Sequence, residues 1–337
     1  MPRYWMVTNR KVGSTGLTGE RGDGLTFWTA TDGPLDRLSA WTKVSRERFQ
    51  ALLTGTANKF ALLKDENFNE QQQHVSLFVH GYNNDWKDAA RRYASICKAL
   101  YHGEGGLGEC VLFTWPSDGQ TTSYLPDRRD ARASAADLAE LLDGFYVWLL
   151  DRQEAATRDP KLACRAKVSV IAHSMGNYVL QKAAQMAWSR RNQPLLVSLI
   201  NQLVMVAADV DNDLFASGET TDGSDGDALA NLTYRITALY SGLDQVLGVS
   251  AGLKHFGKRR LGRSGIPNGT PRPDNVWDVD CTPFFEQGPK TKSGIHSAYF
   301  EHPDTLALMK HVLVGTDRGV LFSRGALTPG RSARPSS

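Results

Sequence analysis

The sequence predicts an α/β protein with a mostly parallel central sheet and helices on both faces. From residue 74 onward, short strand-like runs alternate with longer helix-like runs, the pattern of a parallel sheet with helical crossovers. The strand-like runs are apolar throughout, which indicates burial on both faces of the sheet. One of them leads directly into a tight turn at residues 172–176 (AHSMG), and a helix follows at once.

The expected order of elements follows from these runs. The N-terminal part predicts short strands at residues 4–7 and 25–28 and a helix at 46–53 that stops before Gly55. Further strands are predicted at residues 74–79, 110–115, 168–172, 199–208, 232–240 and 276–279. Helices are predicted at residues 86–100, 130–151, 177–190 and from about 304.

Three segments stand apart from this alternation. Residues 217–230 are rich in Gly, Asp and Thr, which predicts a surface loop. Residues 254–263 form a basic loop, interpreted as a solvated surface with an anionic contact as the alternative. We expect residues 1–73 to be an N-terminal extension packed on the core, 74–314 to be the main domain, and 315–337 to be a mobile tail.

Composition excludes several classes of protein. The 337 residues are 41% hydrophobic and 22% charged, which is ordinary for a globular chain and excludes a disordered one. The net charge of +3 gives no case for a nucleic-acid partner. The partner that we expect, from the motifs described below, is a small-molecule substrate. The longest apolar stretch, residues 194–210, is too short for a transmembrane segment, and nothing indicates an oligomeric state.

The cysteines point to neither a metal site nor a disulfide framework. Cys97, Cys110, Cys164 and Cys281 are scattered and form no CxxC pair. The residues after Met1 lack the apolar core of a secretory signal, so we expect reduced thiols and a cytoplasmic location.

The tight turn at residues 172–176 predicts a nucleophile. A strand–turn–helix context lifts the Ser174 hydroxyl above the carboxyl edge of the sheet, and small residues must flank it. Ala172 stands where the G-x-S-x-G motif has its first Gly, and Gly176 supplies the last. The alternative is a serine that merely caps a helix.

A second loop predicts the oxyanion hole. The strand at residues 74–79 leads into His80 and Gly81, and we expect the amides of Tyr82 and Met175 to bind the oxyanion. The alternative is a plain strand-to-helix turn capped by Asn84 or Asp85.

The base and the acid are sought downstream. His296 follows the last predicted strand and is the expected base, whereas His80 and His173 are expected to pack structurally, and His255 and His302 are weaker candidates. Asp244, after the strand at residues 232–240, is the expected acid, although it also suits the N-cap of a helix.

Asp209 remains the alternative acid. The run from Asp209 to Asp213 begins like a calcium loop but has Leu214 where Gly is needed and Thr220 where Glu is needed. No metal and no cofactor are therefore expected.

Several motifs together carry a family resemblance. They are His80-Gly81-Tyr82-Asn83, residues 113–117 (FTWPS), Tyr124 with Asp127, the turn at Ser174, residues 208–211 (ADVD) and His296-Ser297. In this order they resemble a bacterial α/β-hydrolase family catalogued as a domain of unknown function and lipase- or esterase-like by fold. The resemblance covers roughly residues 74–300, and the acidic loop at residues 219–227 has no counterpart in it.

The resemblance implies an α/β-hydrolase fold and a Ser–Asp–His triad but no particular substrate. It also implies that Trp115, Tyr124 and Asp127 line the mouth of the site, with His80 and Asn83 beside them. We therefore expect a serine hydrolase that cleaves a carboxylic ester through an acyl-enzyme. The alternatives are a thioesterase or amidase with the same triad, or a hydrolase-fold binding protein without turnover.

Overall fold

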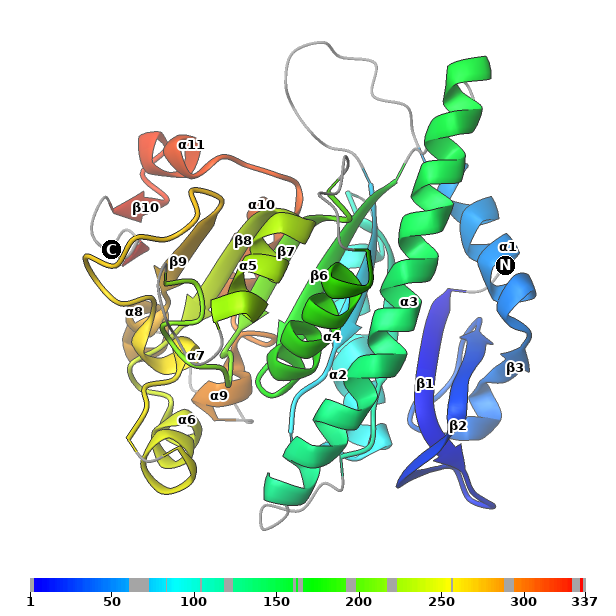
Figure 1. Ribbon diagram of the computed structural model, residues 1–337, viewed down its shortest axis with the longest axis horizontal. Helices are drawn as coiled ribbons and strands as arrows, with labels where there is room; N and C mark the ends of the chain where they lie inside the picture. The colour runs from blue at the N-terminus through cyan, green and yellow to red at the C-terminus, as the bar shows by residue number, and fades with distance from the viewer. Residues whose placement is uncertain are drawn as a thin grey trace.

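The computed structural model describes residues 3–60, 73–82, 84–103, 105–117, 124–159, 162, 166–191, 198–216, 223–255, 257–287, 294–328 and 334–335. Its centre is a nine-stranded sheet in the order β3-β2-β1-β5-β4-β6-β7-β8-β9 (Figure 1). Strands β1 to β3 pair antiparallel, and every pair from β1–β5 across to β8–β9 is parallel. The predicted α/β architecture with a mostly parallel sheet is confirmed.

The main-sheet strands overlap the runs predicted from the sequence, except at residues 42–44, where none is predicted, and the first two strands are longer than expected. The run at residues 74–79 is matched at both ends. The strands are β1 Tyr4–Val12, β2 Leu17–Ala30, β3 Thr42–Val44, β4 His74–Val79, β5 Gly108–Thr114, β6 Lys167–His173, β7 Ile200–Val206, β8 Thr233–Tyr240 and β9 Val276–Asp280. Two short strands, β10 Leu327–Thr328 and β11 Arg334–Pro335, form a separate pair.

Helices cover both faces of the sheet. They are α1 Arg46–Ala57, α2 Trp86–Ile96, α3 Tyr124–Arg158, α4 Gly176–Arg191, α5 Gly223–Leu232, α6 Gln245–Val249, α7 Leu261–Ser264, α8 Thr282–Gln287, α9 Ile295–Ala298, α10 Pro303–Leu313 and α11 Arg318–Ser323. A 3₁₀ turn spans Leu38–Ala40, and π-helical turns extend α2 over Cys97–Tyr101 and α6 over Ser250–Lys254.

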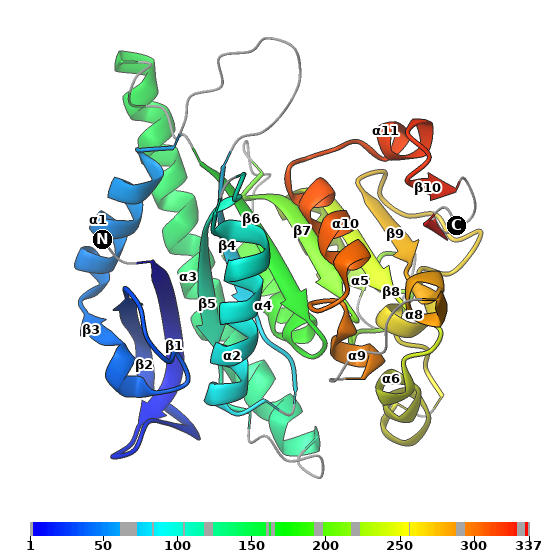
Figure 2. The same cartoon turned by 180° about the vertical axis from the view of Figure 1, so that it is seen from behind.

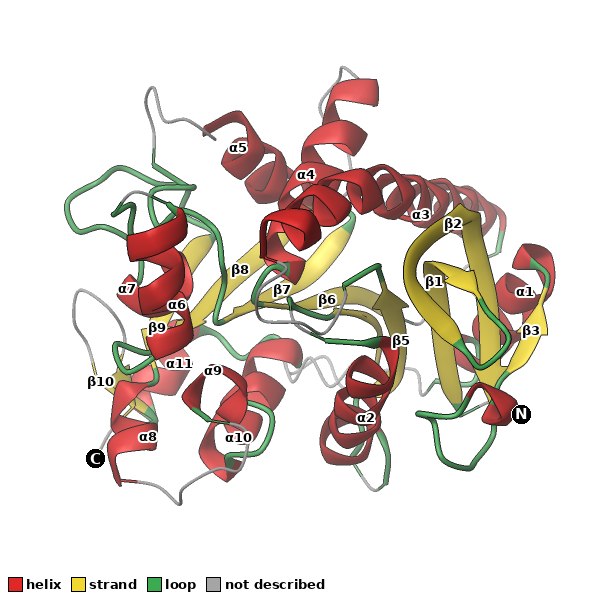
Figure 3. Ribbon diagram, turned by 90° about the horizontal axis from the view of Figure 1, so that it is seen from below, coloured by secondary structure: helices red, strands yellow, loops and turns green. Residues whose placement is uncertain are grey.

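Each face has its own hydrophobic core. Seen along the strands in Figure 3, α3, α4 and α5 lie on one face, and α2 and α10 lie on the other, which Figure 2 shows in front. Neighbouring residues of β6 point to opposite cores: Val170 and Ala172 belong to the first, and Ile171 to the second. This double burial explains why the strand is apolar at successive positions.

The N-terminal strands belong to the same sheet. β1 lies between β2 and β5, with Trp5 beside Val111 in the parallel register. Tyr93 of α2 ties the two strands together, since its hydroxyl accepts from the Trp5 amide at 2.9 Å and donates to the Cys110 carbonyl at 2.6 Å.

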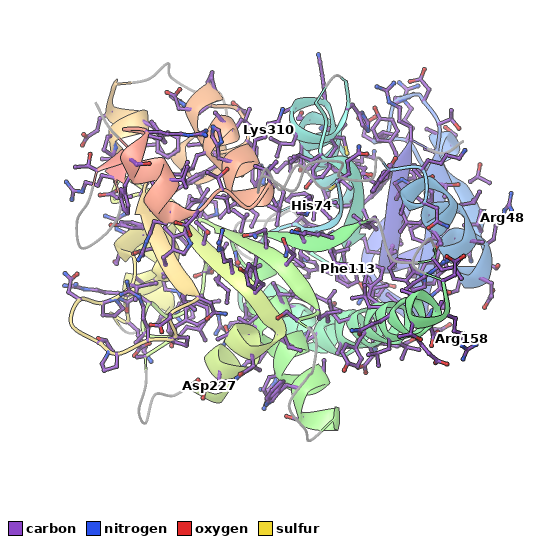
Figure 4. The ribbon with its side chains drawn as sticks, turned by 90° about the horizontal axis from the view of Figure 1, so that it is seen from above. Arg48, His74, Phe113, Arg158, Asp227 and Lys310 are labelled. Atoms are coloured by element: carbon purple, nitrogen blue, oxygen red, sulfur yellow. The ribbon has the colours of Figure 1, made fainter. Side chains whose placement is uncertain are left out.

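The amino ends of the central strands lie at the edge of the sheet shown in Figure 4, where His74 is buried at the start of β4. Its Nδ1 lies 2.8 Å from the Ser169 hydroxyl. Burial, assisted by the charge of Lys167, lowers the pKa of His74 to about 4. Arg48 and Arg158, labelled in the same figure, are exposed on the helices outside.

The predicted surface loop at residues 217–230 is wrong for residues 223–230, which form most of α5; residues 217–222 lie outside the described part. β7 and β8 are parallel neighbours, so the chain must cross over between them. α5 forms part of this crossover, and its residues Ala228 and Leu229 are fully buried. Gly226 packs so closely on the Leu214 carbonyl oxygen that a Cβ would lie 1.9 Å from that oxygen. Gly226 thus allows the helix to pack closely on the segment that contains Leu214.

Two further segments differ from expectation. α1 does not stop before Gly55 but continues to Ala57, because Phe49, Leu53 and Ala57 form one buried face and a single exposed glycine costs a helix only about 1 kcal/mol. The segment expected as a mobile tail contains α11 and β10, with Leu321 and Leu327 buried. Within the described residues, none of the helices combines the length and hydrophobicity of a membrane-spanning segment.

Candidate active site

Ser174 lies in a strained turn between β6 and α4. Its φ of 52° is in the left-handed region that non-glycine residues rarely adopt. The turn is held by hydrogen bonds from the Ser174 amide to the Val206 carbonyl at 3.0 Å and from the Asp209 amide to the Ser174 carbonyl at 3.1 Å. The side-chain amide of Asn177 also donates to the Ala172 and Ser174 carbonyls. This is the geometry of a nucleophile elbow.

Two glycines let other backbone approach the turn. A Cβ on Gly176 would lie 2.5 Å from the His80 carbonyl oxygen and 2.6 Å from that of Val79. A Cβ on Gly81 would lie 2.6 Å from the Ser174 Cβ. The end of β4 therefore passes directly against the serine turn, and a side chain at either position would force them apart.

A chain of hydrogen bonds joins the serine to a histidine and an acid. The Ser174 hydroxyl lies 2.9 Å from Nε2 of His296, and Nδ1 of His296 lies 2.7 Å from Oδ2 of Asp244. The three residues come from the end of β6, from α9 and from the loop after β8. With Nδ1–H donating to the carboxylate, Nε2 is the free acceptor that a serine hydroxyl needs in order to lose its proton.

Asp244 satisfies both interpretations that the sequence allows. Its side chain is fully buried; Oδ2 accepts from His296, while Oδ1 accepts from the Leu247 amide at 3.0 Å and so caps α6. Arg263 also donates to the Asp244 backbone carbonyl. The cap and the carboxylate contact therefore fix the orientation of the side chain together.

Asp209, the alternative acid, is engaged elsewhere. Its Oδ1 accepts from Nε of Arg260 at 2.8 Å and from the Ser250 hydroxyl at 3.0 Å. Arg260 is fully buried and pairs with Asp211 as well. The interpretation of residues 254–263 as a solvated basic loop is thus wrong at Arg260, whose charge is neutralised internally; a buried guanidinium demands such carboxylates.

The loop after β4, formed by His80, Gly81, Tyr82 and Asn84 and here called the β4 loop, lies beside Ser174. Nδ1 of His80 lies 2.8 Å from the Gly81 carbonyl, and Nε2 accepts from the Trp115 amide at 3.2 Å. Burial, assisted by the charge of Arg10, lowers the pKa of His80 to about 3, so the ring is neutral. Its donor at Nδ1 therefore holds the Gly81 carbonyl.

Met175, the other expected oxyanion donor, comes immediately before α4 and is fully buried. Its carbonyl accepts from the Tyr178 and Val179 amides as the helix begins. Its own amide belongs to the first turn, where backbone N–H groups have no acceptor inside the helix.

Arg92 and His173 hold the backbone around His296, and no pattern in the sequence marks Arg92 as part of the site. His173 accepts at Nδ1 from Arg92 at 3.2 Å and donates from Nε2 to the His296 carbonyl at 2.9 Å. Arg92 also donates to the Ser297 hydroxyl at 2.9 Å. Burial and the nearby charge of Arg92 lower the pKa of His173 well below its usual value, which keeps the ring neutral.

Where the structure describes their side chains, the residues expected at the mouth of the site do not lie there. Trp115 is fully buried and stacks on His80 with ring centroids 5.3 Å apart, so neither side chain lines an open mouth. Asn83 lies outside the described residues, as do the side chains of Tyr124 and Asp127. Across the described part of the chain, no group of three or more His, Cys, Asp or Glu side chains could hold a metal ion.

Comparison with solved structures finds distant relatives. They include lipase B of Aspergillus fumigatus (12% identity, TM-score 0.40), a lipase-esterase related protein of Clostridium acetobutylicum (12%, 0.35) and phospholipase PlaB of Legionella pneumophila (13%, 0.37). The matches cover 90%, 72% and 74% of this chain and 63%, 96% and 61% of the relatives. This chain thus spans less than two thirds of the Aspergillus lipase, and identities this low say nothing about substrate.

No curated protein matches the sequence. A family model described as "Alpha/beta hydrolase of unknown function (DUF900)" matches residues 56–274, which is more than half of the chain and includes both Ser174 and Asp244. The resemblance expected from the motifs is confirmed: the chain belongs to the DUF900 family of α/β hydrolases.

Proposed function

We propose that the protein is a serine hydrolase that cleaves carboxylic esters through an acyl-enzyme. The observation that carries the proposal is the hydrogen-bond chain from the Ser174 hydroxyl through His296 to Asp244, with distances of 2.9 and 2.7 Å. The alternative, a serine that merely caps a helix, requires neither a histidine beside the hydroxyl nor a buried carboxylate behind the histidine.

In the first half of the reaction, Ser174 Oγ attacks the ester carbonyl carbon while Nε2 of His296 takes the hydroxyl proton. The buried Asp244 carboxylate stabilises the imidazolium that results and keeps the proton on Nδ1. The oxyanion of the tetrahedral intermediate accepts from the Tyr82 and Met175 amides, each worth about 3 kcal/mol of transition-state stabilisation. Collapse breaks the C–O bond, and the leaving alcohol takes the proton from His296.

In the second half, water attacks the carbonyl carbon of the acyl group bound to Ser174 Oγ and gives a proton to Nε2 of His296. The second tetrahedral intermediate uses the same two amides and collapses to release the acid and return the proton to Ser174 Oγ. This chemistry requires no side chain beyond the three residues of the hydrogen-bond chain, and it serves any acyl group that fits beside the turn.

The test is a panel of p-nitrophenyl esters of increasing acyl length, together with matched thioesters and anilides, assayed with the full chain. We expect ester turnover that Ser174→Ala reduces by roughly 10⁴-fold or more without loss of folding. Ser323→Ala, which removes an exposed hydroxyl on α11, is the matched control and should leave the rate unchanged.

A rate on thioesters or anilides that exceeds the ester rate would move the activity to that acyl class. Equal turnover by Ser174→Ala and the wild type would refute the proposed nucleophile.

A further inference from the structure

Arg10 is a buried cation in β1, far from the residues of the hydrogen-bond chain in sequence. Its side chain is almost inaccessible, with 2% of the residue exposed. Among its acceptors in the described residues are the Thr114 hydroxyl at 3.0 Å and the carbonyls of Thr18, Asn84 and Ser117 at 3.1, 3.1 and 3.2 Å. One planar group thus joins β2, the end of β5 and the β4 loop, which a single ammonium could not do with the same geometry.

The contact with Asn84 leads directly to Ser174. The Asn84 side-chain amide donates to the carbonyls of Gly81 at 3.1 Å and Tyr82 at 2.7 Å. Arg10 holds the backbone carbonyl of the same asparagine, so it fixes the residue whose side chain shapes the loop. Gly81, at the other end of these contacts, packs against the Ser174 Cβ.

The geometry of the peptide bond turns these contacts into a constraint on one amide. The chain has no cis peptide bonds within its described residues, so the Gly81 carbonyl and the Tyr82 N–H belong to one trans plane and point in opposite directions. His80 and Asn84 hold the carbonyl on their side of the loop. The Tyr82 N–H is therefore directed to the other side of the plane.

We propose that Arg10 is a positioning residue for the oxyanion hole: through Asn84 it sets the peptide plane that presents the Tyr82 amide beside Ser174. The inference rests on the proposed function and assigns the N-terminal strand a part in the site. The family match begins at residue 56, so Arg10 lies outside the matched segment.

A purely structural role for Arg10 makes a different prediction, and a neighbouring ion pair separates the two. Arg21 in β2 donates twice to Asp137 of α3, at 2.9 Å each, and so fastens the same N-terminal strands to the body without contact to the β4 loop. Arg21→Ala is therefore the matched control, since it loosens these strands and leaves the Tyr82 plane untouched.

The experiment compares Arg10→Lys, Arg10→Met, Asn84→Ala and Arg21→Ala in the full chain. Thermal melting first confirms that each variant is folded. We expect Arg10→Met and Asn84→Ala to lower kcat by 10- to 100-fold with KM within about threefold, because a displaced oxyanion donor acts on the transition state. Arg10→Lys should fall between Arg10→Met and the wild type, and Arg21→Ala should keep the wild-type kcat.

Two further readouts are added to ester turnover, and the second of them does not depend on it. The inhibition constant of an arylboronic acid, whose tetrahedral adduct places an oxygen in the hole, should rise by the factor by which kcat/KM falls. Hydrogen exchange of the peptide that contains Gly81 and Tyr82 should quicken in Arg10→Met and Asn84→Ala but not in Arg21→Ala.

The exchange measurement stands even if the protein fails to hydrolyse esters, so the two proposals can fail separately. Should Arg10→Met not fold, Asn84→Ala and Arg10→Lys carry the test. Wild-type kcat and wild-type exchange in these two variants would overturn the role of Arg10, as would equal changes in Arg21→Ala.

Discussion

Exchanging Asp244 for asparagine should disable the site while sparing the fold. The asparagine side chain has one carbonyl oxygen and one amide. The oxygen can keep the 3.0 Å bond from the Leu247 amide, so that α6 retains its cap. The side-chain amide then faces Nδ1 of His296, 2.7 Å away, and a donor there forces the imidazole proton onto Nε2. With Nε2 protonated, the Ser174 hydroxyl has no acceptor.

The expected magnitude is a loss of roughly 10⁴-fold in kcat, the size of the same exchange in the Ser–His–Asp triad of a serine protease. At about 1.36 kcal/mol per tenfold change, this corresponds to about 5.4 kcal/mol of transition-state stabilisation. The melting temperature should change little because the cap survives. Asp244→Ala should lose the cap as well, at a further cost of about 1 kcal/mol in the free energy of unfolding.

Asp209→Asn is the matched comparison, because it makes the same chemical change at the alternative acid. It weakens the pairing of the buried Arg260 and should therefore cost more stability, about 3 kcal/mol, and much less activity than Asp244→Asn. The assay is ester turnover under saturating substrate, with urea unfolding of each variant. A role for Asp244 as the acid is refuted if Asp244→Asn keeps more than a tenth of wild-type kcat or if Asp209→Asn is the less active of the two variants.

Three further predictions concern packing, pH and the support of His296. Gly176→Ala should cost at least 1–3 kcal/mol in the free energy of unfolding, because the added Cβ would meet backbone oxygens at 2.5–2.6 Å. Gly55→Ala, which has open space around it, should instead gain about 0.5–1 kcal/mol. Urea unfolding that gives the two variants equal stability would contradict this. Because burial lowers the pKa values of His74 to about 4 and His80 to about 3, both are neutral in the folded protein near pH 6, whereas the unfolded chain protonates them below about pH 6.5. Each should therefore lower the free energy of unfolding by about 1 kcal/mol per pH unit as the pH drops from about 6.5 to 5, and a free energy of unfolding that stays constant over that range would refute this. Arg92→Met should reduce kcat by about 10²-fold with little change in KM, because the backbone around His296 loses the contacts of Arg92 with His173 and Ser297. Arg92→Lys should recover part of this loss. Equal kcat in the wild type and both variants would exclude a positioning role for Arg92.

Local sequence patterns are sufficient where burial or close packing requires a short run of characteristic residue types. The apolar run at residues 74–79 is β4 because both faces of that strand are buried, and the small residues of the turn at 172–176 are needed because the end of β4 passes 2.5 Å from the Cβ position of Gly176. The choice of Asp244 over Asp209 rests on something less local. Both follow strands, and Asp244 is the one expected from the sequence; the contact of Asp244 with His296 and the ion pair of Asp209 with Arg260 join residues that are far apart in the sequence.

Other features depend on contacts that the sequence does not display. Arg10 reaches Asn84 across 74 positions and Arg92 reaches Ser297 across 205, so neither arginine differs in the sequence from a surface residue. α5 was missed for another reason. Its glycines and aspartates favour a loop locally, and the helix is stabilised by burial on the face of the sheet, where it packs against α4 and β8.

The nucleophile is tested most directly by mapping which residue a fluorophosphonate probe modifies. The full chain is labelled, digested and analysed by mass spectrometry, beside Ser174→Ala and His296→Ala. The proposed mechanism predicts one adduct, on the peptide that contains Ser174, at a rate that His296→Ala strongly reduces and that Ser174→Ala abolishes. An adduct on another residue, or undiminished labelling of Ser174→Ala, would contradict the assignment of Ser174 as the nucleophile.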